Sequence, residues 1–382
     1  MNRVGEDLIK VTDYKVLGRL PELFKFDDGN PVVTPGDWEK RRGEIYKTAI
    51  ELQYGTMPPA PDFVEVENVG DQLCRSYRIH TGTRDNPISF YMKLIIPEKR
   101  NGPCPVIVDG DMCFNYFWSD GFLNAALEQG VAWVLFDRTE IAHDVRAEGR
   151  RVGQIYNTYP GYTFGALGAW AWGYSRCVDA LEILFGGREN PEIDLSLITF
   201  TGHSRGGKTA ALAGALDKRA AIVNPNQSGE CGCGCYRILM QGYCEGVNSH
   251  TRSEVLRDDV TLFPYWTGPE LASYVDREQD LPFDSHFLKA LIAPRVLYTS
   301  DAAADIWANP IGAWMTNMAA KDVWGLLGKP DNLIWRYREG VHSHTAEDIQ
   351  MLVNVIKHYK DPNVPLDECF FATPFKPREF IF

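Results

Sequence analysis

Short apolar or β-branched runs alternate with longer segments of helical periodicity through most of this chain. The runs predict strands at 88–96, 105–108, 131–136, 197–200, 221–223, 295–299 and 333–337. Helices are expected at 38–53, before the first run, and then at 119–129, 163–185, 206–217, 285–292, 309–327 and 345–359. Because strands that alternate with helices build a parallel sheet covered on both faces, we expect a mostly parallel central sheet in a three-layer α/β sandwich.

The chain is interpreted as one domain over residues 1–382, since it contains no internal repeat and no low-complexity linker. A polar, proline-containing extension is expected over 1–60, the core over 61–360 and a short tail over 361–382. The hydrophobic share of 45% and the charged share of 24% are typical of a globular protein. No run approaches the ~20 apolar residues of a membrane span, and residues 1–8 lack the apolar segment of a signal peptide. We expect a cytoplasmic protein and take it to be a monomer.

Charge and cysteine content narrow the choice of partners. The formal net charge is −12, whereas nucleic acids and anionic membrane surfaces both require basic patches, so neither is expected as a partner.

The nine cysteines include Cys231, Cys233 and Cys235, with Cys244 beyond them. Zinc sites usually separate paired cysteines by about two to four residues and use a second pair further along the chain. We therefore expect reduced thiols in a loop and no metal.

A glycine-flanked serine is the most informative local motif. Gly202, Ser204 and Gly206 match the pattern G-x-S-x-G, with the apolar run 197–200 before it and the small-residue segment 209–216 after it. In a sharp strand-to-helix turn, side chains at the two glycine positions would crowd the backbone that presents the serine. The helix N-terminus then offers free N–H groups to a developing oxyanion. The motif predicts a nucleophilic serine.

A nucleophilic serine needs a base and an acid that orients the base, in the chain order serine, acid, histidine. His342 and His344 follow the last predicted strand, in the loop where the base belongs, and we prefer His342 because it is closer to the glycine turn. His358, inside the terminal helix, is interpreted as a surface or packing residue. The acid is expected after the strand at 295–299, where spacing alone leaves Asp301 and Asp305 open.

Two cations follow the serine closely. Arg205 is the next residue, and Lys208 lies one helical turn further on. Because helical side chains lean toward the N-terminus, both are expected to bring positive charge to the mouth of the site. This arrangement suits a substrate rich in hydroxyl groups, or one whose hydrolysis leaves a carboxylate. The alternative is that both are solvated cations on an exposed helix face.

The segment 202–208 reads G-H-S-R-G-G-K and resembles the G-[CH]-S-R-x-G-K motif of the glucuronoyl esterases of carbohydrate esterase family 15, in the histidine form of the bacterial branch. Further matches in the same order lie at 54–61, 138–140, 170–173, 281–286, 291–295 and 305–310. The similarity therefore runs from about residue 50 to residue 360.

The resemblance implies an α/β-hydrolase fold and cleavage of the ester between 4-O-methyl-glucuronate on xylan and a lignin alcohol. It makes Ser204 the nucleophile and His342 the base. Arg205 would stabilise the oxyanion through its backbone N–H and its guanidinium. Lys208, together with Trp307 and Glu254, would bind the uronate ring. No metal or organic cofactor is implied.

The sequence departs from the family pattern at the acid. Some members take the triad acid from a glutamate after the sixth strand, where this chain has the neutral Gln227. The family's D-x-W match instead selects Asp305 over Asp301, and Glu230 remains a third candidate. The expected substrates are small or oligosaccharide uronate esters. The alternatives are an acetyl-xylan or other small-ester hydrolase on the same fold, and a non-catalytic carbohydrate-binding protein.

Overall fold

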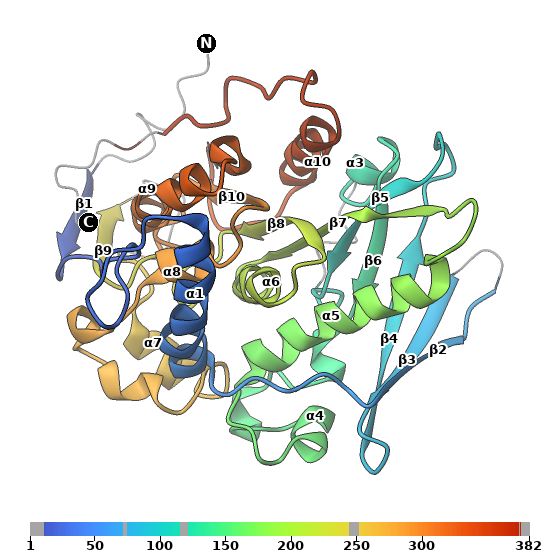
Figure 1. Ribbon diagram of the computed structural model, residues 1–382, viewed down its shortest axis with the longest axis horizontal. Coiled ribbons are helices and arrows are strands. Elements are labelled where there is room, and N and C mark those ends of the chain that lie inside the picture. The colour runs from blue at the N-terminus through green and yellow to red at the C-terminus, as the bar shows by residue number, and fades with distance from the viewer. Residues whose placement is uncertain (1–10, 72–74, 115–120, 244–251, 374, 376–382) are drawn as a thin grey trace.

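The computed structural model describes residues 11–71, 75–114, 121–243, 252–373 and 375. Its central sheet has nine strands in the order β11-β10-β8-β7-β5-β6-β4-β3-β2 (Figure 1). The strands are β2 Phe63–Asn68, β3 Arg75–Gly82, β4 Pro87–Ile95, β5 Cys104–Asp109, β6 Ala132–Phe136, β7 Ile193–His203, β8 Ala220–Asn226, β10 Val296–Ala302 and β11 Leu333–Arg338. The pairs from β11 to β6 are parallel, and those from β6 through β4 and β3 to β2 are antiparallel.

Helices cover both faces of this sheet. They are α1 Pro35–Ile45, the π-helical turn η1 Tyr46–Glu51, α2 Leu52–Tyr54, α3 Asn124–Leu127, α4 Gln154–Thr158, α5 Ala166–Phe185, α6 Arg205–Leu216, α7 Leu256–Leu262, α8 Ser285–Ala290, α9 Pro310–Leu326 and α10 Ala346–Lys360. α5 and α6 pack together against one face, and α10 and α3 pack together on the other (Figure 1). The predicted mostly parallel sheet in a three-layer α/β sandwich is confirmed.

The alternation of side chains along the central strands explains the two helical layers. Val106 and Val108 of β5 belong to the core under α5 and α6, whereas Ile107 between them belongs to the core under α10. Successive side chains of a strand point to opposite faces, so a strand that is apolar throughout must be covered on both. The purely apolar β6 divides in the same way, with Val134 on one side and Trp133 on the other.

A smaller sheet lies beside the main one. β1 Val11–Val16 pairs antiparallel with β9 Ile238–Tyr243, more than two hundred residues away in the chain. Trp38 and Ile45 of α1 are fully buried in the same hydrophobic cluster as α5 and α6. The part of the predicted N-terminal extension that forms α1 is therefore packed against the core. Within the described part of the chain, no helix is both long enough and apolar enough to cross a bilayer.

The seven predicted strands are all present, whereas β1, β2, β3 and β9 were not predicted. β2 and β3 carry charged residues at every second or third position because they are antiparallel and partly exposed. The helix predicted at 119–129 is reduced to α3, and residues 119 and 120 lie outside the described residues.

Candidate active site

Ser204 lies between the end of β7 and the start of α6, with φ 57° and ψ −119°. The two glycines of the motif are required by close packing. A Cβ atom on Gly202 would lie 2.4 Å from the carbonyl oxygen of Gly206, and one on Gly206 would lie 1.9 Å from Oδ2 of Asp111. Real Cβ atoms do not approach other atoms so closely. The predicted crowding of the backbone is confirmed at Gly202, whereas at Gly206 an added side chain would meet the carboxylate of Asp111.

The turn around Ser204 is anchored on both sides. Asp111 accepts the backbone N–H of His203 at 2.9 Å through Oδ2, and it forms a fully buried ion pair with Arg138. On the other side, Asn226 accepts the N–H of Ser204 at 2.9 Å through its carbonyl oxygen. Its side-chain oxygen lies 2.7 Å from Nδ1 of His203. These contacts hold the strained serine in one backbone conformation.

His342 lies beside this turn and is paired with an acid. Its Nδ1 is 2.7 Å from Oδ2 of Asp305, and its ring centroid is 4.5 Å from that of His203, the residue before the serine. The His342 side chain is 36% exposed, whereas that of Asp305 is 1% exposed. His344 is buried, which lowers its pKa to about 4. The structure therefore brings His342, and not His344, together with a candidate acid at the solvent-facing side of the turn.

The other two candidate acids occupy different surroundings. Burial raises the pKa of Asp301 to about 7, against the opposing effect of a buried lysine. Glu230 is fully buried, and among the described residues neither of its carboxylate oxygens has a hydrogen-bond partner. Burial and nearby carboxylates raise its pKa well above the usual value. Of the three acids, Asp305 is the one that the described contacts pair with His342.

Arg205 projects from the first turn of α6 and is held in place. Its guanidinium Nη1 is 3.0 Å from Oδ2 of Asp144, and its Cζ lies 5.0 Å from the ring centroids of both Phe263 and Trp266. Burial raises the pKa of Asp144, but the guanidinium groups of Arg205 and Arg138 bring it below its usual value. Arg205 is 27% exposed, so it is a fixed cation that solvent can reach.

The three predicted binding residues meet one helical turn further along α6, where the Lys208 amine lies 5.7 Å from the ring centroid of Trp266 that Arg205 also contacts. The amine of Lys208 donates to Oε2 of Glu254 at 2.6 Å and to the carbonyl oxygen of Glu230 at 2.5 Å. Glu254 in turn donates its backbone N–H to the carbonyl oxygen of Trp307 at 2.9 Å. Burial disfavours the charged amine, yet the Glu254 carboxylate holds the pKa of Lys208 above its usual value. Lys208 is 2% exposed, so the interpretation as a solvated surface cation is wrong for this residue.

The cysteine cluster lies in the interior. Cys231, Cys233 and Cys235 are buried free thiols. The Cys231 sulfur lies 3.3 Å from Oδ2 of Asp259. Cys244 lies outside the described residues. The predicted free thiols thus lie in the connection between β8 and β9, and this connection is buried in the core.

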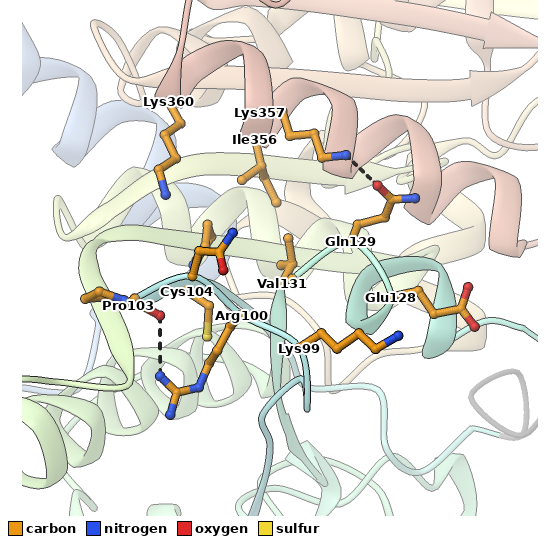
Figure 2. Close-up of a pocket in the computed structure, with 14 residues that line it drawn as sticks. Lys99, Arg100, Pro103, Cys104, Glu128, Gln129, Val131, Ile356, Lys357 and Lys360 are labelled. Atoms are coloured by element: carbon orange, nitrogen blue, oxygen red, sulfur yellow. Dashed lines mark hydrogen bonds between the residues drawn. The ribbon is translucent and has the colours of Figure 1, made fainter.

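A hollow of about 410 Å³ opens at the opposite edge of the sheet, where β5 begins and α10 ends (Figure 2). Lys99, Arg100, Lys357 and Lys360 line it together with Glu128. None of the candidate site residues lines this hollow. The chemistry predicted from the sequence belongs to the carboxyl edge of the parallel strands, where α/β sheets usually carry their sites.

A mostly parallel sheet, a serine at a strained strand-to-helix turn and a neighbouring histidine–aspartate couple together define an α/β-hydrolase fold. A family model described as glucuronyl esterase, fungi, matches residues 79–328. This chain belongs to the glucuronyl esterase family.

Two fungal 4-O-methyl-glucuronoyl methylesterases are similar in sequence. The protein from Podospora anserina is 34% identical over 332 residues, covering 87% of this chain and 65% of that protein. The protein from Hypocrea jecorina is 34% identical over 329 residues, covering 86% of this chain and 66% of that protein. This chain therefore spans just under two thirds of the length of these curated relatives.

Solved structures agree with the assignment. A glucuronoyl esterase of carbohydrate esterase family 15 from Caldicellulosiruptor kristjansonii superposes with a TM-score of 0.81 at 28% identity and covers 95% of each chain. A serine-to-alanine mutant of the glucuronoyl esterase from Sporotrichum thermophile, in complex with methyl 4-O-methyl-β-D-glucopyranuronate, superposes with a TM-score of 0.73 at 26% identity. This superposition covers 91% of this chain and 89% of the Sporotrichum thermophile chain.

Proposed function

We propose that this protein is a serine carboxylic-ester hydrolase that cleaves esters of glucuronic acid, either small uronate esters or those on oligosaccharides. The observation that carries the proposal is the bond between His342 and Asp305 beside the strained Ser204. The family assignment supports the substrate class, since the similar fungal proteins are named for 4-O-methyl-glucuronoyl esters.

The proposed mechanism begins with the orientation of the base. When Nδ1–H of His342 donates to Asp305, the other ring nitrogen is left as an acceptor. That nitrogen takes the proton of Ser204 as the serine oxygen attacks the ester carbonyl carbon. The imidazolium formed in this step is stabilised by the Asp305 carboxylate at 2.7 Å. The carbon–alkoxy bond then breaks, and His342 returns the proton to the leaving alcohol.

Arg205 has two proposed roles at the oxyanion. As the first residue of α6, its backbone N–H has no acceptor within the helix and is available to the tetrahedral intermediate. Its guanidinium, fixed by Asp144, adds a positive charge at the same mouth of the site. After the alcohol leaves, water activated by His342 attacks the acyl-enzyme and releases glucuronic acid.

The uronate pocket is proposed to form around Lys208, Glu254 and Trp307. An ammonium group has three protons, and two of those on Lys208 go to Glu254 and to the carbonyl oxygen of Glu230, so one remains for a hydroxyl of the sugar. Glu254 has a second carboxylate oxygen that can accept a hydroxyl. Trp307 would provide an apolar face for the ring. Small-molecule sites generally combine aromatic side chains with a few placed polar groups, and these three residues supply a donor, an acceptor and an aromatic ring.

The proposal is tested by hydrolysis of the benzyl ester of glucuronic acid. Purified wild type is expected to turn it over, and Ser204→Ala is expected to lose all measurable turnover while its circular dichroism and melting temperature stay close to wild type. Methyl galacturonate, acetylated xylose and nitrophenyl acetate serve as comparison substrates. If the acetyl esters were hydrolysed faster and a uronate group gave no advantage, the proposed substrate class would be wrong and acetyl esters would take its place. If folded wild type hydrolysed none of these esters, the proposed hydrolase activity would be wrong, and carbohydrate binding without catalysis would be the remaining hypothesis.

A further inference from the structure

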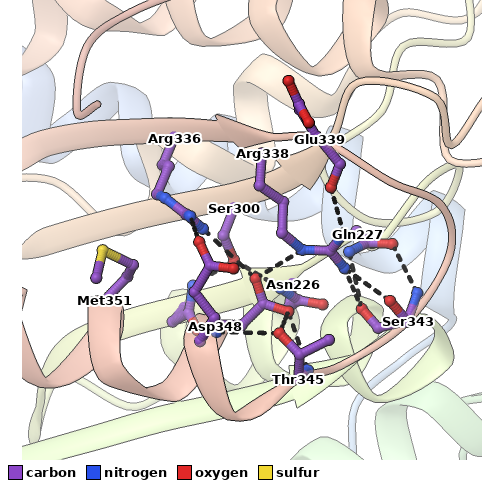
Figure 3. Close-up of polar contacts among 12 residues, drawn as sticks. Asn226, Gln227, Ser300, Arg336, Arg338, Glu339, Ser343, Thr345, Asp348 and Met351 are labelled. Atoms are coloured by element: carbon purple, nitrogen blue, oxygen red, sulfur yellow. Dashed lines mark hydrogen bonds and ion pairs between the residues drawn. The ribbon is translucent and has the colours of Figure 1, made fainter. Parts of the chain in front are cut away.

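The loop that carries His342 is fastened by a glutamine from another part of the chain. Gln227 donates its side-chain Nε2–H to the carbonyl oxygen of Ser343 at 2.9 Å, and its Oε1 accepts the N–H of Ser343 at 3.1 Å. A single side-chain amide thus pairs with both backbone groups of the residue next to His342. Figure 3 shows Gln227 and Ser343 facing each other across this pairing.

Gln227 is itself rigidly placed. It is 1% exposed, and its backbone N–H donates to the carbonyl oxygen of Ser300 in β10 at 2.9 Å. The residue before it, Asn226, accepts the N–H of Ser204 at 2.9 Å. Two consecutive residues at the end of β8 therefore contact the backbone of the nucleophile and the backbone beside the base. Asn226 and Gln227 therefore link the two backbones, and the distance between Ser204 and His342 depends on how these two residues are placed.

Arg338 fastens the same loop from its other side. Its guanidinium donates to the carbonyl oxygen of Ser343 at 2.8 Å and to that of Glu339 at 2.9 Å, while its Nε donates to Asp348 at 2.9 Å (Figure 3). Asp348 also completes the capping box of α10 with Thr345. Removing Arg338 would therefore disturb a helix end as well as the loop, whereas Gln227 acts on the loop alone.

We propose that Gln227 is a positioning residue for the catalytic base, which it holds at the nucleophile by pairing with both backbone groups of Ser343. The role rests on the proposed function of Ser204 and His342. An amide is suited to it because it supplies a donor and an acceptor side by side. A glutamate carboxylate at this position would accept the N–H of Ser343 but would have no proton for its carbonyl oxygen.

The test uses a matched pair of substitutions. Gln227→Met keeps the volume of the side chain and removes both hydrogen bonds. Gln154 makes the same two-way pairing far from the site, donating to the carbonyl oxygen of Ser89 at 2.9 Å and accepting its N–H at 3.1 Å. Gln154→Met therefore removes the same kind of paired bonds from the fold, together with one further bond to the carbonyl oxygen of Glu140 at 2.8 Å, and leaves the loop of His342 untouched.

Two readouts separate positioning from stability. On the benzyl ester of glucuronic acid, Gln227→Met is expected to lower kcat by about 10- to 100-fold with little change in KM, since misplacing a catalytic group by about 1 Å costs up to about a hundredfold. The rate at which a fluorophosphonate labels Ser204 is expected to fall in parallel. Gln154→Met is expected to stay within about twofold of wild type in both readouts, at a comparable loss in melting temperature.

A second variant covers the case in which Gln227→Met does not fold. Gln227→Asn keeps the donor and the acceptor on a side chain that is one methylene shorter, so its kcat is expected to lie between those of wild type and Gln227→Met. A fluorophosphonate carries no uronate group, so the rate at which it labels Ser204 reports the activation of the serine and not the choice of substrate. Wild type that is labelled but does not turn over uronate esters would refute the substrate proposal alone. Labelling of a folded Gln227 variant at the wild-type rate would refute the positioning role alone.

Discussion

Gly206→Ala tests how the turn around the serine is packed. The new Cβ would lie 1.9 Å from Oδ2 and 2.3 Å from Oδ1 of Asp111, so the carboxylate must move by more than 1 Å to restore ordinary contact. That carboxylate accepts the N–H of His203 and pairs with the buried Arg138. Its displacement breaks the closer ion pair of Arg138 and leaves the guanidinium with Asp144, whose Oδ2 lies 3.5 Å away.

The expected size of the effect follows from the buried pair. Breaking a buried ion pair by removing one partner destabilises a protein by about 3–5 kcal/mol. With an unfolding entropy of roughly 2.1 cal/mol/K per residue, a chain of 382 residues loses about 4–6 °C in melting temperature for that free energy. Activity should fall more steeply than stability, because the displaced turn also carries Ser204.

Gly325→Ala is the matched control. Gly325 lies in α9, is exposed, and has no atom within 4 Å of an added Cβ. The same substitution should there stabilise the helix by about 0.5–1 kcal/mol, because glycine loses more backbone entropy than alanine on folding. Thermal unfolding of both variants by circular dichroism or calorimetry measures the difference. A melting temperature for Gly206→Ala at or above that of wild type would refute the reasoning about Asp111.

Two further predictions concern the candidate acids. Asp305→Asn should lower kcat by about 10³- to 10⁴-fold, because an amide at this position favours the wrong tautomer of His342. Asp301→Asn should retain most of the activity. Equal losses of kcat in the two variants, measured by a steady-state assay, would contradict the assignment of Asp305. The pKa of Asp301 is raised to about 7 by burial, so between pH 4 and 7 the folded state keeps a proton that the unfolded state releases, and stability falls as pH rises, by up to about 1.4 kcal/mol per pH unit. Denaturant unfolding of Asp301→Asn should show a weaker decline than wild type over this range, and an unchanged slope would contradict it.

The parts of the site that depend on local sequence could be predicted. The elbow is a continuous segment whose glycine spacing was predicted from backbone crowding, and the structure shows that crowding at Gly202. At Gly206 the space is occupied by the carboxylate of Asp111, which spacing does not identify. The preference for His342 over His344 also agrees with the structure, in which His342 pairs with Asp305. Both histidines occupy one loop, however, and only packing decides that the ring of His344 is turned into the core.

The residues that sequence reasoning missed act over long separations. Asp144 fixes Arg205 from 61 residues earlier in the chain, and Gln227 holds Ser343 from 116 residues earlier. Neither partner is identifiable from spacing. Gln227 stood out only as the absence of an expected glutamate, and its hydrogen-bonding role became visible once β8 and the loop after β11 were brought together. Similarly, β1 and β9 escaped prediction because each is a short strand whose partner lies more than two hundred residues away in the chain.

The contact between Gly206 and Asp111 separates what the fold requires from what the chemistry requires. A descendant of this protein that abandoned hydrolysis would be free to replace the serine hydroxyl, since that hydroxyl makes no capping hydrogen bond to α6. It would not be free to replace the glycine, because a buried carboxylate occupies the space of its missing side chain. We therefore expect Gly206 to be retained with the fold, whether or not the activity is kept, and Ser204 to be retained only with the activity.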